Sequence, residues 1–129
     1  MGFRVVRPDE LEWIEREPEA GPVPRYVARL TEVLGFAHTR GNIWRFPPGA
    51  KGRRHKDAIQ DETFVVLDGT LTMYLGEPPD RVDVSKGGVV HVESATVLQS
   101  VNHGDEDVLV FAYGAPPETG EAEFFDSAV

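Results

Sequence analysis

The sequence predicts an all-β domain folded as an antiparallel sandwich or barrel. Turn-forming residues recur at short intervals along the 129 residues, which include 13 glycines and 10 prolines. The runs between these turns are rich in β-branched and aromatic residues, and short strands at such regular spacing are typical of a sandwich or barrel. Two of these runs flank Asp68-Gly69, a dipeptide that favours a tight hairpin.

Six strands are expected in the central and C-terminal parts of the chain. They cover residues 42–46, 63–67, 71–75, 89–92, 97–101 and 108–113. A chain of this length fits one domain with its own core. We therefore predict a single domain over residues 1–129, composed of an N-terminal arm or strands (1–36), a barrel (37–115) and a C-terminal tail (116–129).

The first third of the chain is less regular. Residues 8–17 fit either a short helical turn or an extended arm. In residues 25–36 the apolar side chains of Val27, Leu30 and Val33 follow a helical stripe, but they are also compatible with strands broken by a turn.

The composition excludes several classes of partner and site. The net charge is −9, whereas nucleic acids and anionic membranes attract clustered cations. One basic cluster, formed by Lys51, Arg53, Arg54 and Lys56, fits either a solvated loop or an anion-attracting rim beside a pocket. The chain has no cysteine, which excludes disulfides and thiolate metal sites. No apolar run approaches the ~20 residues of a membrane helix, and the N-terminus lacks an apolar signal core, so a cytoplasmic protein is expected.

Residues 49–69 carry the most specific pattern in the chain. Gly49 is followed by His55, Asp57, Glu62 and finally Gly69. This spacing resembles the first motif of the cupin family, which has glycine, two histidines, glutamate and glycine in this order. Asp57 stands where the family has its second histidine. The resemblance implies a double-stranded β-helix, the cupin or jelly-roll barrel, of the small single-domain type.

A second stretch, from Gly88 to Asn102, is similar to the second cupin motif. Glu93 and Ala95 stand where that motif has proline and glycine, and Leu98 stands where it has a metal-binding histidine. Since leucine cannot bind a metal, the resemblance leaves three possible ligands, His55, Asp57 and Glu62.

The resemblance implies a pocket inside the barrel. Its predicted lining residues are Arg53, His55, Asp57, Glu62, Phe64, His91 and Leu98. One imidazole and two carboxylates would suit a divalent ion such as Mn²⁺, Fe²⁺, Zn²⁺ or Mg²⁺. In the alternative without metal, Arg53 would pair with Asp57 or Glu62, because an unpaired buried charge is unfavourable.

Three functions fit the sequence. The first is a small-molecule-binding cupin barrel with a degenerate metal centre and an unknown ligand. The second is a metal-dependent enzyme that uses His55, Asp57 and Glu62 in an oxygenase, decarboxylase or isomerase reaction, with Arg53 or Arg54 binding a substrate carboxylate. The third is a partner-binding protein that acts through its acidic surface. The resemblance also implies a homodimer, with residues 1–6 packing across the partner's sheet.

Overall fold

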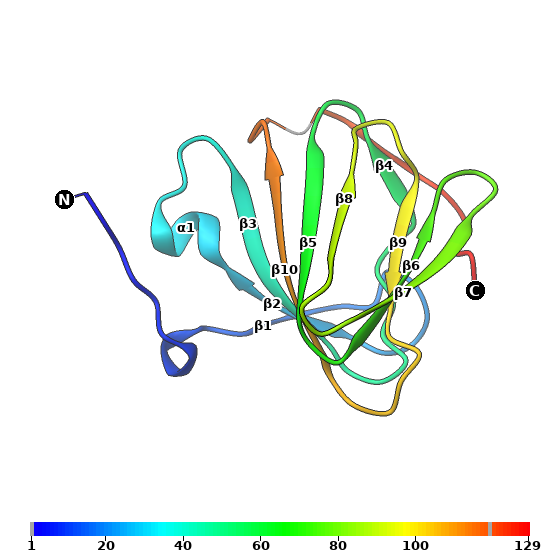
Figure 1. The fold of residues 1–129 in the computed structure, drawn as a ribbon, viewed down its shortest axis with the longest axis horizontal. Helices are drawn as coiled ribbons and strands as arrows, with labels where there is room; N and C mark the ends of the chain where they lie inside the picture. Colours follow the sequence, from blue (N-terminus) through cyan, green and yellow to red (C-terminus); the bar gives the residue numbers. More distant parts are fainter. Residues whose placement is uncertain (1, 119) are drawn as a thin grey trace.

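Two antiparallel β-sheets packed against each other form the body of the protein (Figure 1). This computed structural model describes residues 2–118 and 120–129. One sheet has the strand order β1-β2-β3-β10-β5-β8, and the other has the order β11-β4-β9-β6-β7. The arrangement confirms the predicted all-β class.

The strands of the first sheet are β1 (Ile14–Arg16), β2 (Arg25–Arg29), β3 (Arg40–Phe46), β5 (Asp61–Asp68), β8 (Val89–Val92) and β10 (Val108–Ala115). Those of the second are β4 (His55–Asp57), β6 (Thr70–Leu75), β7 (Asp80–Ser85), β9 (Leu98–Val101) and β11 (Ala122–Phe124). Each of the six expected strands agrees with an observed strand or overlaps it. The hairpin between β5 and β6 turns at Gly69, whose φ of 75° is in the left-handed region that favours glycine.

Three strands have weak sequence signals. β7 is an exposed edge strand with only two apolar residues, Val82 and Val84, and it pairs with β6. β1 and β11 have three residues each. The predicted C-terminal tail thus contributes β11, which pairs with β4.

Residues 25–36 contain both of the structures that their sequence allowed. The strand β2 runs directly into the short helix α1 (Leu30–Leu34), which ends at Gly35 with a φ of 67°. In the N-terminal segment, a 3-10 turn over Pro8–Glu10 precedes β1. No helix in the described residues is long and apolar enough to cross a membrane.

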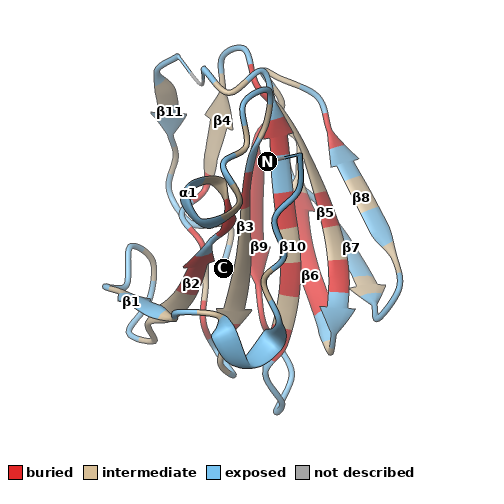
Figure 2. Ribbon diagram, turned by 90° about the vertical axis from the view of Figure 1, so that its left-hand side faces the viewer, coloured by how far each residue is buried: buried red, intermediate tan, exposed pale blue. Residues whose placement is uncertain are grey.

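The core lies between the two sheets, where buried strands face one another (Figure 2). Phe64, Val66 and Val110 of the first sheet belong to the same buried cluster as Leu71 and Met73 of the second. Packing of these apolar side chains leaves one end of the space between the sheets for polar groups, and the candidate site lies there.

Candidate functional site

A cavity of about 380 Å³ lies between the two sheets. This volume is within the usual range of small-molecule sites. His55, Asp57 and Glu62 line it together with Phe64, and Asn42 and Gln60 add amide groups. The cavity therefore combines an apolar wall with a small number of polar groups, as small-molecule sites generally do.

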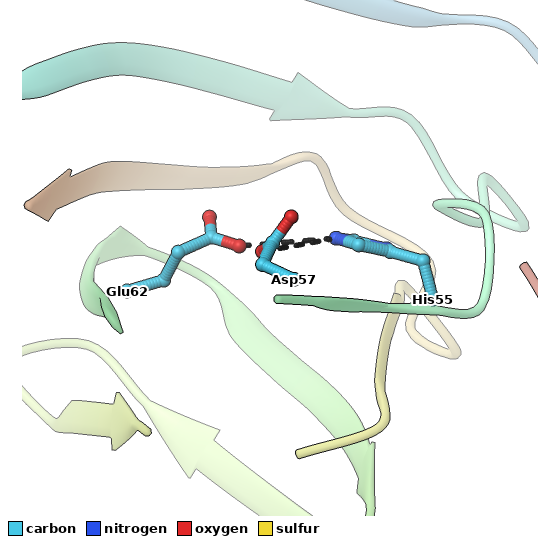
Figure 3. Close-up of side chains that lie close together, drawn as sticks. All are labelled: His55, Asp57 and Glu62. Carbon is cyan, nitrogen blue, oxygen red and sulfur yellow. Dashed lines mark ion pairs between the residues drawn. The ribbon is translucent and has the colours of Figure 1, made fainter. Parts of the chain in front are cut away.

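His55, Asp57 and Glu62 point toward one another inside this cavity (Figure 3). His55 and Asp57 are the first and last residues of β4, so their side chains lie on the same face of the strand. Glu62 is the second residue of β5. Nε2 of His55 lies 3.6 Å from Oδ2 of Asp57 and 3.8 Å from Oε1 of Glu62. One possible ligand atom from each residue lies within 4.8 Å of the other two.

The ring orientation of His55 is fixed by the backbone of Arg53, two residues earlier. Nδ1 lies 2.8 Å from the carbonyl oxygen of Arg53, and because a carbonyl can only accept, Nδ1 donates its proton there. Nε2 is therefore the nitrogen that faces the two carboxylates. It is either protonated, giving an imidazolium between two anions, or unprotonated with its lone pair available to a cation.

Without a cation, the carboxylates strongly favour the protonated form of His55. Burial alone would lower the pKa of His55, but the neighbouring carboxylates of Asp57 and Glu62 raise this pKa to about 10. Burial would raise the pKa of Asp57, but interaction with His55 lowers it to about 2. Burial and the neighbouring Asp57 raise the pKa of Glu62. The metal-free trio thus retains a proton at neutral pH.

The turns around the trio fix the ends of β4 and β5. The N–H of Ala95 donates to the carbonyl oxygen of Asp57 at 2.6 Å. Ala95 has a φ of 63°, the left-handed conformation that explains the glycine expected there from the motif. Gly114 lies opposite Glu62, and a Cβ atom on it would come within 2.8 Å of the carbonyl oxygen of Asp61. Only glycine allows this close approach of β10 to the turn before Glu62.

Leu98 occupies the position beside His55 where the motif has its fourth ligand. The two residues are cross-strand partners of β4 and β9, so their side chains extend on the same side of the sheet. Leu98 is buried in the apolar core and is not among the residues that line the cavity. Leu98 is therefore part of the core and not of the cavity lining, contrary to the prediction that it lines the pocket.

The structure places the basic residues differently from the sequence interpretation. Arg53 lines the cavity but forms no ion pair with Asp57 or Glu62 in the described residues, so the proposed Arg53–carboxylate pairing is wrong. Its guanidinium stacks on Phe124 of β11, 3.7 Å from the ring centre. Arg54 points the other way, is buried, and pairs with Glu77 at 3.0 Å. The cation between the carboxylates is His55 itself.

His91 also lies away from the cavity. It is exposed, and its Nδ1 lies 2.8 Å from the hydroxyl of Thr63 on the neighbouring strand. Thr63 and His91 alternate with inward residues such as Phe64, so both face outward. His91 therefore does not meet the expectation that it lines the pocket.

Three further cavity residues, which come from the N-terminal third or its edge, carry no recognisable signal in the sequence. Arg16 of β1, Arg25 of β2 and Arg40 of β3 all line the cavity. Arg40 contributes to the low pKa of Asp57 through its charge. No local pattern marks these arginines, because only the pairing of β1 with β2, and of β2 with β3, brings them to the cavity.

The trio is chemically and geometrically suited to a divalent metal. With bonds of about 2.1 Å, two ligands of one ion lie about 3.0–3.4 Å apart. The observed 3.6 and 3.8 Å separations from Nε2 of His55 to the two carboxylates would need to shorten by about 0.2–0.8 Å. A histidine whose other nitrogen donates to a carbonyl is the usual arrangement of a metal ligand. His55, Asp57 and Glu62 are thus a group that could hold a metal.

The comparisons with known proteins agree on the fold. The family model of the cupin domain matches residues 42–113. This range includes His55, Asp57, Glu62 and Leu98, and it covers more than half of the chain. None of the curated proteins is a significant match to the sequence.

Several solved structures are similar along nearly the whole chain. A cupin-superfamily sugar phosphate isomerase from Silicibacter pomeroyi has a TM-score of 0.79 at 23% identity, over 96% of this chain and 83% of that one. A polyketide cyclase from Streptomyces resistomycificus has a TM-score of 0.78 at 19% identity, over 97% and 87%. A predicted oxalate decarboxylase from Thermotoga maritima has a TM-score of 0.77 at 21% identity, over 88% and 99%. At these identities the likeness shows a common fold.

Proposed function

Because this chain belongs to the cupin family and has its double-stranded β-helix fold, we propose that it binds a small molecule in the cavity. The molecule would bind at a metal centre with three protein ligands, one fewer than the family motif provides. His55, Asp57 and Glu62 would hold the ion. The observation that carries this proposal is the hydrogen bond from Nδ1 of His55 to the carbonyl of Arg53, which presents Nε2 to both carboxylates.

Each part of the site has a role in this proposal. A bound divalent ion would act as a Lewis acid that polarises an oxygen of the bound molecule. With only three protein ligands, positions remain open for the molecule or for water. Phe64 and Phe124 supply apolar walls of the cavity, while Asn42 and Gln60 offer amide groups for orientation. The similar proteins described as an isomerase, a decarboxylase and a cyclase support a chemical step on such a molecule.

A metal titration with pH control tests the proposal. Protein freed of metal should bind about one Mn²⁺ per chain. Since His55, with a pKa of about 10, must lose a proton to bind, the apparent affinity for Mn²⁺ should rise about tenfold per pH unit between pH 6.5 and 8.5.

The stability of the metal-free protein should depend on pH as well. Protonated His55 interacts with the two carboxylates only in the folded state, so its contribution to the free energy of unfolding is complete below about pH 6.5 and is lost as the pH rises to about 10. Calorimetry and thermal unfolding at each pH measure both effects, and no binding at millimolar Mn²⁺ would contradict the proposal.

A second candidate function is acid–base catalysis without metal. The observation that favours it is the proton that the trio retains at neutral pH, since the pKa of His55 is raised to about 10 and that of Glu62 is raised as well. A protonated histidine beside a carboxylate can donate and accept protons in an isomerisation. Turnover that persists after chelator treatment would identify this candidate, whereas turnover that returns only with added metal would identify the first.

We also propose that two copies form a homodimer through their N-terminal segments. The segment after Gly2 extends away from the barrel (Figure 1), and Phe3 on it is 82% exposed. Val5 is exposed as well. Such apolar side chains on an extended arm favour packing against a second copy. Met1 lies outside the described residues.

Light scattering coupled to gel filtration is expected to give twice the mass of one chain at micromolar concentration. A variant with Phe3→Ser and Val5→Ser should shift toward monomer. Val33→Ser, which changes an exposed valine on α1, is the matched control. A wild-type monomer would contradict the proposal.

A further inference from the structure

The guanidinium group of Arg25 has no hydrogen-bonded partner within residues 2–118 and 120–129, although the side chain is only 12% exposed. Its nearest opposite charge is Oε1 of Glu19, 3.7 Å from Nη2, a separation beyond hydrogen-bonding distance. A guanidinium has five donors and stays charged, so a nearly buried one without acceptors is an unusual arrangement. Arg25 lines the same cavity as the trio.

The surroundings hold this guanidinium in one place. It lies over the ring of Trp44, with the central carbon 4.4 Å from the ring centre, and 5.5 Å from that of Phe46. On another side it lies beside Gly52, where an added Cβ atom would be 3.3 Å from Nη1. A flat cation stacked on an aromatic face is pre-organised, so little side-chain freedom is lost when its donors meet a ligand.

Glu19 is a weak and shared partner for Arg25. Its Oε1 lies 3.3 Å from Nη2 of Arg16, closer than to Arg25. One carboxylate therefore faces two arginines at the edge of the cavity, which leaves an excess of positive charge there. Burial lowers the pKa of Arg25 to about 10, which agrees with a cation that lacks compensation. An anion that entered the cavity would supply the compensating negative charge.

We propose that Arg25 binds an oxyanion of the cavity's ligand, a carboxylate or a phosphate group, and that Glu19 only partly balances the charge of Arg25 until that ligand arrives. The inference deepens the proposed function, because it rests on the cavity being a small-molecule site and names the class of molecule. Planar, paired N–H donors match the two oxygens of a carboxylate or phosphate.

The position of Arg25 also limits the size of the molecule. Gly52, which contacts the guanidinium, precedes His55 by three residues, and three residues span at most about 11 Å. A ligand held by Arg25 at one end could therefore place its other end near His55, Asp57 and Glu62. A small molecule with an acidic group at one end and oxygen substituents at the other meets both requirements.

Anion titrations of metal-free protein test this assignment. Inorganic phosphate and malonate are added separately at constant ionic strength, and binding is followed by the fluorescence of Trp44, which lies under Arg25. A Trp13→Phe variant isolates this signal, because the chain has two tryptophans. The anion that binds more tightly distinguishes a phosphate from a carboxylate ligand.

Two substitutions are expected to act in opposite directions. Arg25→Gln should weaken anion binding by about 10- to 100-fold, the effect of losing charged hydrogen bonds. Glu19→Gln should tighten it by about 2- to 5-fold, because the competing carboxylate is removed. Arg29→Gln is the matched control, since Arg29 is on the same strand but pairs with Glu32 and does not line the cavity.

The outcomes separate this inference from the metal proposal. Binding that is unaffected by Arg25→Gln, or that weakens in Glu19→Gln, overturns the assignment. If Arg25→Gln does not fold, Arg25→Lys and Glu19→Gln still test it, because lysine keeps the charge without the paired donors. If the protein binds anions but no Mn²⁺, the role of Arg25 is supported and only the metal centre is contradicted. If it binds Mn²⁺ but no anion, the metal centre is supported and the role of Arg25 is contradicted.

Discussion

The His55→Ala variant is expected to lose at least about 100-fold in affinity for Mn²⁺. Removing a group that merely orients a ligand typically lowers metal affinity by about 10- to 100-fold, and removing the ligand itself should lower it more. His55 contributes the one nitrogen of the trio, and the remaining Asp57 and Glu62 would repel each other without it. Calorimetric titration of metal-free wild-type and variant protein measures the difference.

His91→Ala is the matched control for this substitution. His91 is also a histidine near a carboxylate, 4.0 Å from Asp61, but it is exposed and lies outside the cavity. We expect it to bind Mn²⁺ as the wild type does. Equal binding by His55→Ala and wild type would place the metal elsewhere, and loss in His91→Ala alone would point to the His91–Asp61 pair.

The Leu98→His variant is expected to bind Zn²⁺ about 100-fold more tightly than the wild type. Leu98 is the cross-strand partner of His55, so an imidazole there would extend on the same side of the sheet as the ring of His55 and could supply a fourth ligand. Imidazole nitrogen suits Zn²⁺ well. Without metal the variant should be about 1–3 kcal/mol less stable, because a polar ring replaces a buried leucine in the core.

Zinc should reverse this loss of stability, because an ion that binds only the folded state stabilises it. Thermal unfolding with and without Zn²⁺ therefore gives a readout independent of any reaction. Leu98→Phe, which places a ring without a nitrogen at the same position, should show no gain in affinity. If Leu98→His and Leu98→Phe bind Zn²⁺ equally, residue 98 does not reach the trio.

The elements that the sequence predicted well are those with local signals. The strands β5 and β6 are rich in β-branched and apolar residues on both sides of Asp68-Gly69, and the turn there follows from a glycine with positive φ. His55, Asp57 and Glu62 lie within eight residues, on two consecutive strands that belong to opposite sheets. Strand alternation puts His55 and Asp57 on one face, and the packing of the two sheets brings Glu62 to them. Whether they bind a metal stays a prediction.

The basic side of the site shows why the rest could not be read from the sequence. Arg53 and Arg54 are near the trio in the chain and were natural candidates for binding a carboxylate. In the structure, Arg54 points to the opposite face from Arg53 and forms an ion pair with Glu77. The guanidinium of Arg53 lies over the ring of Phe124, near the C-terminal end of the chain. Neither partner is near these arginines in sequence.

The sequence by itself thus determined the all-β class, the family, the main strands and the candidate ligands, because hydrophobic alternation, turn residues and motif spacing are local properties. Only the tertiary structure placed Arg25 on Trp44 and Gly52, because this contact depends on the order β2-β3 in one sheet and on the segment before β4 in the other. Strand order and register are set by packing over the whole barrel. For this reason the part of the cavity that Arg25 lines, where we propose that an anion binds, could not be predicted from the sequence.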